Sequence, residues 1–157
     1  MSLRLRPLID ADLDTLFEWE RDPLAVQLAA FTREDPSDRN AFDAHYRKVR
    51  NDESNVLLAV EMDGRFVGTV SAFTIEGDRE VSYWIDPARW REGLATTALA
   101  ALLAVEITRP LYARVAEHNL GSAKVLERAG FVRIGAETSH ANGLGRQITE
   151  HIYQLAT

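Results

Sequence analysis

The stretch W-R-E-G-L-A-T-T-A, residues 90–98, decides the fold of this protein because of the two segments that it joins. Before it, residues 80–85 read E-V-S-Y-W-I, a pattern typical of a strand. After its first residues, an apolar run over residues 93–108 predicts a buried helix. Gly93 and Ala95 are therefore small residues at a point where a strand turns into a helix.

Small residues at this point have two explanations. The first N–H groups of a helix have no partner within the helix and carry partial positive charge. Gly93 and Ala95 would let a bulky anion approach that backbone, which predicts a phosphate or pyrophosphate site. Arg89 and Arg91 can add positive charge there. Alternatively, Gly93 only eases a tight turn and Ala95 is only a good helix former, and the stretch by itself leaves both explanations open.

Length and composition predict one soluble domain, residues 1–157, with a substantial core. Hydrophobic residues make up 46% of the chain, which argues against disorder. The net charge of -6 argues against a general binder of nucleic acid or of anionic membranes. The longest apolar run, residues 98–105, is too short to cross a bilayer, and the alternating N-terminal sequence does not read as a signal peptide. The absence of cysteine excludes disulfides and thiolate nucleophiles and suits a cytoplasmic protein.

The hydrophobic periodicity predicts a mixed α/β fold. Strands are expected at residues 3–6, 56–61, 66–74, 80–85, 111–116, 131–137 and 147–155. Helices are expected from Asp10 or Asp12 to about residue 20, at 24–30, from Ser37 or Asp38 to about 49, at 93–108 and at 122–129. Asp63-Gly64 fits a type I′ hairpin turn, and Gly77-Asp78 predicts a second turn. The three middle strands should therefore form an antiparallel meander, and residues 139–145 should form a loop.

A second motif, N-L-G-S-A-K-V-L-E-R-A-G-F, covers residues 119–131. Ser122 is placed to cap the helix within it, and Gly130 is placed to end that helix. Asn119 follows a predicted strand and can be no more than a turn residue. By itself, this motif indicates local structure only.

Taken together, the motifs resemble the GNAT superfamily of acyl-CoA-dependent N-acetyltransferases, above all its ribosomal-protein N-terminal acetyltransferase branch. The resemblance rests on E-V-S-Y-W-I-x-P, W-R-E-G-L-A-T-T-A-L and N-x-x-S-x-x-V-L-E-R-A-G-F in that order, and on F-E-W-E-R-D-P at residues 17–23. It implies the GNAT fold, a mixed, mostly antiparallel twisted sheet flanked by helices. It also implies a splay between the strand that ends near Ile85 and the strand Leu111–Ala116.

The resemblance implies acetyl transfer from acetyl-CoA, the co-substrate, to a primary amine by direct attack. The loop before the long helix would hold the pyrophosphate, and the splayed strand would pair with the pantetheine arm. The implied cofactor-binding residues are Tyr83, Trp84, Ile85, Trp90, Arg91, Glu92, Gly93, Leu94, Ala95, Thr96, Asn119 and Ser122. The implied catalytic residues are Glu80 as the base, Ser122 near the thioester sulfur, and Asn119 beside the pantetheine or the acetyl group.

The sequence departs from the family pattern at positions that matter for this function. Glu92 puts a carboxylate beside the predicted pyrophosphate site. Leu126 stands where many relatives carry a tyrosine general acid, which leaves Ser122 as the proton donor. Glu80 can also be a plain strand residue. These departures keep a second function open, that of a non-catalytic acyl-CoA-binding or regulatory module.

The acceptor is left open by the sequence. The amine can belong to a protein or peptide N-terminus or to a small molecule such as an amino acid, a polyamine or an aminoglycoside. The resemblance places Trp19, Glu20, Tyr46 and residues 31–33 over the acceptor pocket, although each can equally be core or surface. The four histidines show no metal-binding spacing, so no metal is expected. The protein should be a monomer or a homodimer.

Overall fold

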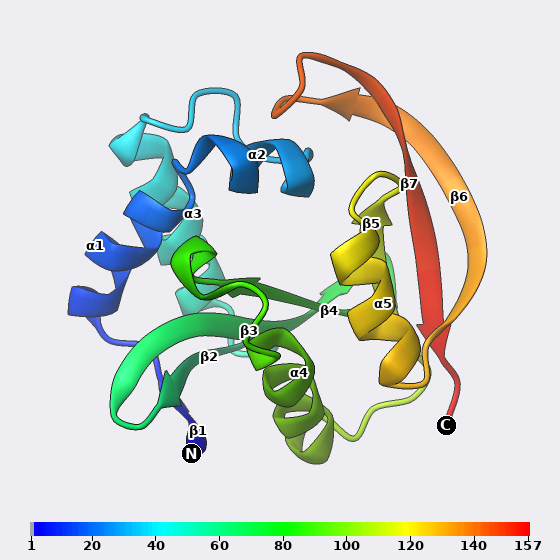
Figure 1. Ribbon diagram of the computed structural model, residues 1–157, viewed down its shortest axis with the longest axis horizontal. Coiled ribbons are helices and arrows are strands. Elements are labelled where there is room, and N and C mark those ends of the chain that lie inside the picture. The colour runs from blue at the N-terminus through cyan, green and yellow to red at the C-terminus, as the bar shows by residue number, and fades with distance from the viewer. Residues whose placement is uncertain (1) are drawn as a thin grey trace.

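The middle of the chain forms the predicted antiparallel meander in the computed structural model, which describes residues 2–157 (Figure 1). Its strands are β2 (Val56–Met62), β3 (Arg65–Ile75) and β4 (Asp78–Ile85). Asp63 and Gly64 both have positive φ, as a type I′ turn requires. In the second turn the positive-φ residues are Glu76 and Gly77, one position earlier than predicted, because Asp78 already belongs to β4.

The meander belongs to a seven-stranded sheet in the order β1-β2-β3-β4-β5-β7-β6. The remaining strands are β1 (Leu3–Pro7), β5 (Leu111–Ala116), β6 (Val132–Ala141) and β7 (Arg146–Leu155). All neighbours are antiparallel except β4 and β5, which are parallel and pair only at Glu80 and Tyr112. Beyond this pair the two strands separate toward Ile85, so the predicted splay is confirmed.

Within the described residues 2–157, five α-helices cover the two faces of the sheet (Figure 1). They are α1 (Asp10–Trp19), α2 (Pro23–Ala29), α3 (Arg39–Asn51), α4 (Leu94–Val105) and α5 (Leu120–Arg128), and a short 3₁₀ turn, η1 (Pro87–Arg89), follows β4. The mixed, mostly antiparallel α/β architecture agrees with the fold predicted from the sequence. Within residues 2–157, no helix is both long enough and apolar enough to cross a membrane.

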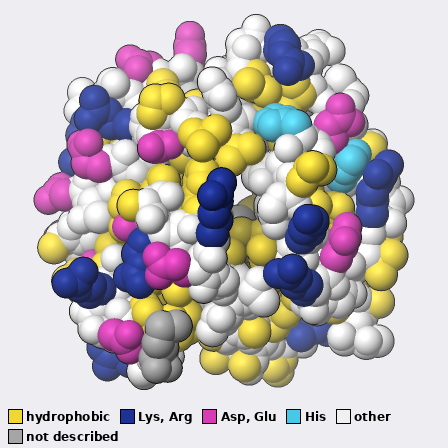
Figure 2. Space-filling view, viewed as in Figure 1, with side chains coloured by type: hydrophobic (Ala, Val, Ile, Leu, Met, Phe, Trp, Pro, Cys, Tyr) yellow, Lys and Arg dark blue, Asp and Glu magenta, His cyan; other side chains and the backbone are white. Residues whose placement is uncertain are grey.

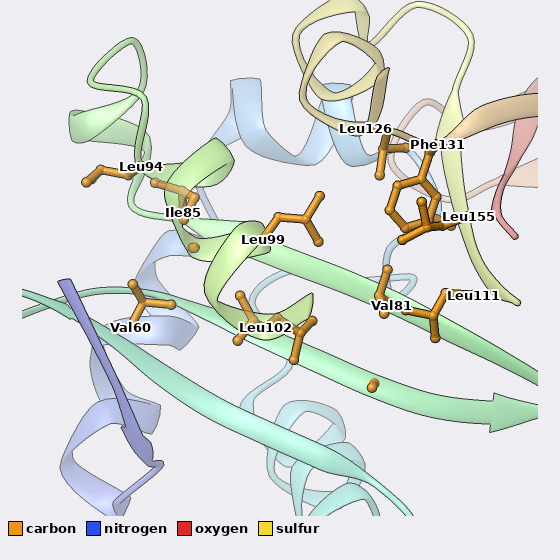
Figure 3. Close-up of a cluster of buried hydrophobic side chains, with 14 of the residues drawn as sticks. Val60, Val81, Ile85, Leu94, Leu99, Leu102, Leu111, Leu126, Phe131 and Leu155 are labelled. Atoms are coloured by element: carbon orange, nitrogen blue, oxygen red, sulfur yellow. The ribbon is translucent and has the colours of Figure 1, made fainter. Parts of the chain in front are cut away.

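The main core lies between the sheet and α4. Leu99 and Leu102 of α4 are fully buried against Val81 of β4 and Leu111 of β5 (Figure 3). Because side chains alternate along a strand, Trp84 faces the opposite side, where it packs against a second cluster built on α1 and α3. One face of strand β4 therefore packs against the core under α4, and the other face packs against the cluster built on α1 and α3.

Some helix ends differ from the prediction. Helix α4 ends at Val105 and not at 108, because Glu106 is extended and its carboxylate pairs with Arg79 at 2.7 Å. The cap of α1 is Ile9, not Asp10 or Asp12, although the Asp12 carboxylate reaches back and accepts a hydrogen bond from the Ile9 N–H at 2.9 Å.

The start of α5 and the last hairpin also differ from the prediction. Asn119 is the N-cap of α5, and its side chain accepts a hydrogen bond from the Ser122 N–H at 3.2 Å. The prediction that Ser122 caps this helix is wrong, since Ser122 already lies in the first turn. Strand β6 continues to Ala141, which shortens the predicted loop 139–145, because the residues around His140 pair in register with β7.

Gly68→Ala is expected to destabilise the fold by about 1–3 kcal/mol. A Cβ at Gly68 would lie 2.5 Å from the Trp84 carbonyl oxygen and 2.8 Å from Ile85 Cδ1, so the end of β4 would have to move. Urea unfolding measures the loss. Gly135→Ala is the matched control, because nothing lies within 4 Å of its Cβ position, and the change expected there is within about 0.5 kcal/mol. Equal stability of both variants would show that β4 does not need this close approach.

Candidate active site

A groove of about 1340 Å³ runs along the splay between β4 and β5. Figure 2 shows the molecule hollowed near the centre of one face, with Lys and Arg side chains on both sides of the hollow. The groove extends from the loop before α4 and from α5 to the region beneath α2 and α3. It therefore joins the two motifs found in the sequence to the helices at the N-terminus.

The loop before α4 forms one end of the groove. Gly93 is the N-cap of α4 with φ 75°, and a Cβ built on it would meet nothing within 4 Å. Arg91 also has positive φ, which turns the backbone of this loop sharply. Leu94, Ala95 and Thr96 of the first helical turn all line the groove. Backbone N–H groups without intrahelical partners thus face an open space that the glycine leaves free, an arrangement suited to a phosphate or pyrophosphate group.

The charge around this end is positive although the whole protein is acidic. Arg89 and Arg91 line the groove from the loop, and Lys124 and Arg128 line it from α5. The sequence analysis missed the latter two, although their spacing of four residues within the second motif puts them on one face of a helix. These cations add to the field of the helix N-terminus.

Glu92 does not oppose this positive charge. Its carboxylate pairs with Arg89 at 2.9 Å, and this hydrogen bond lowers the pKa of Glu92. Glu92 is not among the residues that line the groove. The structure therefore turns the carboxylate away from the predicted anion site, and Glu92 shapes the loop without facing the groove.

Tyr83 and Ser122 meet across the splay. The Tyr83 hydroxyl lies 2.6 Å from Ser122 Oγ, and both residues line the groove. Burial raises the pKa of Tyr83, so the phenol keeps its proton at neutral pH. Asn119 lies in the same place, where its amide donates to the Leu28 carbonyl at 3.3 Å. Asn119 thus ties the start of α5 to the end of α2.

The aromatic residues after Tyr83 are placed by the end of β4. The Trp90 indole N–H donates to the Ile85 carbonyl at 3.1 Å, which fixes the loop against the strand. Trp84, Ile85 and Trp90 all line the groove. Because β4 has no partner strand on its β5 side beyond Glu80, its backbone edge is open to an extended ligand there.

A cluster of charges lies where β4 and β5 are still paired. Arg114 contacts Glu80 at 3.6 Å, and it also contacts Glu137 at 2.8 Å and Glu150 at 3.1 Å. Glu80 is 6% exposed. Burial raises the pKa of Glu80, and the charge of Arg114 offsets part of that rise. Arg114 and Glu150 line the groove, whereas Glu80 lies behind them.

The far end of the groove holds a second, partly buried polar group. Arg33 donates to Glu20 at 2.6 Å, and the Tyr46 hydroxyl donates to the other oxygen of the same carboxylate at 2.6 Å. Burial, together with the Glu20 charge, raises the pKa of Tyr46 well above its ordinary value. All three residues line the groove. Within residues 2–157, no group of His, Asp and Glu side chains is placed to hold a metal ion.

Except for Glu80 and Glu92, all the predicted site residues line this one groove. Those that line it are Tyr83, Trp84, Ile85, Trp90, Arg91, Gly93, Leu94, Ala95, Thr96, Asn119 and Ser122. The groove thus gathers segments that are far apart in the sequence, and Glu80 lies just behind it on the same strand as Tyr83.

Similar structures share this fold over nearly the whole chain. One is a spermidine N-acetyltransferase from Vibrio cholerae in complex with CoA and spermine, with 21% identity and a TM-score of 0.82 over 98% of this chain and 95% of that one. Another is RimJ of Mycobacterium smegmatis in complex with CoA-disulfide, with 24% identity and a TM-score of 0.79 over 99% and 82%. A third is a ribosomal-protein-alanine N-acetyltransferase from Brucella melitensis, with 24% identity and a TM-score of 0.80 over 98% and 99%.

The sequence itself gives the family. No curated protein matches it significantly. The model of the GNAT acetyltransferase domain, in contrast, matches residues 2–132, which include the loop before α4, the splayed strand and all of α5. With the shared fold, this match confirms the resemblance seen in the sequence motifs: the chain belongs to the GNAT acetyltransferase family and is an acetyltransferase.

Proposed function

We propose that this protein transfers the acetyl group of acetyl-CoA to a primary amine by direct attack of the amine on the thioester. The observation that carries the proposal is the open N-terminus of α4, where Gly93 leaves space beside free backbone N–H groups at one end of the splayed groove. The family match and the CoA complexes of similar structures support it.

The residues at this end of the groove fit the phosphates of CoA. The N–H groups of residues 94–96 would hold the pyrophosphate. Arg91, Lys124 and Arg128 would balance its charge. The unpaired edge of β4 would pair with the extended pantetheine arm as an added strand does. When bound, acetyl-CoA supplies an acetyl group activated as a thioester.

Glu80 is the residue that we assign to take the proton of the amine. An amine is protonated near neutral pH, so it must lose a proton before it attacks. Burial gives Glu80 a raised pKa, which makes it a stronger base than an exposed glutamate. Since Glu80 lies behind the groove lining, the proton would reach it through a water molecule.

Ser122 is the residue that we assign to the leaving thiolate. Its hydroxyl can donate a proton or a hydrogen bond to the sulfur, and the 2.6 Å contact with Tyr83 holds it in place. The position of the missing family tyrosine, Leu126, is 1% exposed in the core. The phenol of Tyr83 instead reaches Ser122 from β4. This hydroxyl pair argues against a module that only binds acyl-CoA.

Ser122→Ala is expected to lower kcat by about tenfold to a hundredfold and to change acetyl-CoA affinity by less than about threefold, because its hydroxyl acts on the leaving group. Steady-state kinetics with a calorimetric titration measures both. Tyr83→Phe should give a smaller loss of kcat, since Ser122 stays but loses its hydrogen bond. If Ser122→Ala turns over at the wild-type rate, Ser122 has no chemical role.

The experiment that tests the proposed function is CoA release from acetyl-CoA by the purified protein in the presence of amines. Release that depends on an amine, with formation of the acetylated amine by mass spectrometry, is the expected result. Tight acetyl-CoA binding without release for any primary amine would instead support the binding module. A protein that does not bind acetyl-CoA and does not release CoA would contradict both the enzyme and the binding module.

A further inference from the structure

We infer that the acceptor carries a single amino group next to an uncharged, apolar group, and that polyamines are poor acceptors. This inference rests on the proposed function and specifies the substrate class of the same groove. It comes from the way in which the carboxylates and aromatic side chains of the groove are distributed.

The charge cluster around Arg114 attracts one ammonium group. Three carboxylates, those of Glu80, Glu137 and Glu150, share this one guanidinium, so the cluster keeps an excess of negative charge. Glu150 faces the groove from β7 beside Arg114. A cation is attracted to such an excess of negative charge, most strongly where water is partly excluded. The amino group of the acceptor therefore has its counter-charge at this point, beside Glu80.

The far end of the groove lacks a free carboxylate. Both oxygens of Glu20 are occupied, by Arg33 and by Tyr46 at 2.6 Å each. Arg33 is held in this position because its guanidinium also lies over the rings of Phe17 and Phe42, 5.4 and 5.3 Å from their centroids. Breaking this pair to free Glu20 for a second ammonium would leave the Arg33 charge partly buried without a carboxylate partner.

One other carboxylate, Asp52, lines the groove at its exposed rim. Its Oδ1 accepts hydrogen bonds from the backbone N–H and the hydroxyl of Ser54, at 2.9 and 2.6 Å. A pair with an exposed carboxylate is screened by water and salt and contributes little binding free energy. Asp52 therefore does not replace the occupied Glu20 as a partner for a second ammonium.

Between these ends the groove lining is largely apolar, and the Ser71 and Ser82 hydroxyls, 2.7 Å apart, are bonded to each other. Phe73 of β3 is directly opposite Glu80 of β4, so the two side chains lie side by side on one face of the sheet. Phe31 and Trp84 line the same region, together with Leu28 and Ala29 of α2. A group attached to the reacting amine would rest on Phe73, where a methylene or an aromatic ring gains free energy by leaving water. A second ammonium there would lose much of its hydration without finding a carboxylate partner.

The test compares CoA release with phenylalaninamide, with a tripeptide amide that begins with phenylalanine, and with spermidine. Wild-type protein is expected to show kcat/KM at least about tenfold higher for one of the first two than for spermidine. These two arms also separate a small amine from a peptide N-terminus as the source of the amine. Comparable or better release with spermidine would overturn the inference and leave the proposed function standing. No release with any amine would overturn the proposed function and, with it, this inference.

Arg33→Gln tests the role of the occupied carboxylate. The substitution frees the Glu20 charge, so the ratio of kcat/KM for spermidine to kcat/KM for phenylalaninamide should rise by at least about tenfold. Arg21→Gln is the matched control, because Arg21 also pairs with a glutamate, Glu18, and lies over Phe17 at 5.3 Å, but it does not line the groove. A folded Arg33→Gln protein that still rejects spermidine would show that this pair does not set the specificity.

Phe73→Ala gives a second measurement that does not depend on the stability of the Arg33 variant. The KM for phenylalaninamide should rise about tenfold more than the KM for ethylamine, because the aromatic group of phenylalaninamide loses much more apolar contact than the two carbons of ethylamine. Equal changes for both amines would show that no apolar group of the acceptor rests on Phe73, which would contradict the inference.

Discussion

Gly93→Asp is expected to weaken acetyl-CoA binding by at least about a hundredfold, or about 2.7 kcal/mol, while the protein stays folded. The change places a carboxylate in the open space at the N-terminus of α4, where the pyrophosphate is proposed to lie. Like charges at this distance repel, and the new side chain also fills the space. Calorimetric titration with acetyl-CoA and far-UV circular dichroism measure the two effects.

Gly93→Asn separates charge from shape. Asparagine tolerates a positive φ better than most residues and has nearly the size of aspartate, but it carries no charge. It should weaken binding clearly less than the aspartate variant does. Equal losses would mean that bulk alone matters, and an unchanged affinity in both variants would remove the anion site from this loop.

Glu80→Gln is expected to lower kcat by at least about a hundredfold with little change in acetyl-CoA affinity. The amide has the same shape but cannot accept the proton of the amine. Glu150→Gln is the matched control, since Glu150 contacts the same arginine and faces the groove. A larger loss in the Glu150 variant than in the Glu80 variant would transfer the role of the base to β7.

The pH dependence gives an independent check on Glu80. A base works only when it has lost its proton, so activity should rise with pH through the pKa of Glu80, which burial places above that of an ordinary glutamate. Arg114→Gln removes a positive neighbour, and this raises the pKa of Glu80 further. The acid limb of kcat/KM should therefore move to higher pH in that variant. A limb that moves to lower pH would show that another group titrates.

Local patterns were sufficient to predict the architecture. The Asp63-Gly64 turn, the long apolar helix and the strand at residues 80–85 each depend on residues near in sequence, and all three are present in the structure. The errors in the prediction lie at the ends of helices and strands, because contacts with residues distant in sequence help to set where an element ends. Glu106 pairs with Arg79 and lies outside α4, and Asn119, not Ser122, is the N-cap of α5.

The parts of the site that lie within one sequence motif were predictable. The parts that are formed by residues from distant segments were not. The loop around Gly93 follows from its own nine residues. The contact between Arg114 and Glu150 joins two strands through pairing that no local pattern reveals. The hydrogen bonds of Glu20 bring together three segments: the end of α1, Tyr46 of α3 and Arg33 of the loop after α2. No local pattern in the sequence shows that these segments meet. Cytoplasmic location and the choice between monomer and homodimer stay predictions of the sequence.

The end of α2 and the loop after it, which line the groove, are hydrogen-bonded to the β6–β7 hairpin. The Gly143 N–H donates to the Ala30 carbonyl at 2.7 Å, and the Asn142 amide donates to the Thr32 carbonyl at 3.0 Å. A Cβ on Gly143 would lie 2.5 Å from the Val26 carbonyl oxygen. Residues 26–32 and the tip of the β6–β7 hairpin therefore hold each other in place. If the N-terminal helices of a relative are grafted onto this protein to change its acceptor, the matching hairpin tip has to be grafted as well, because it packs against them.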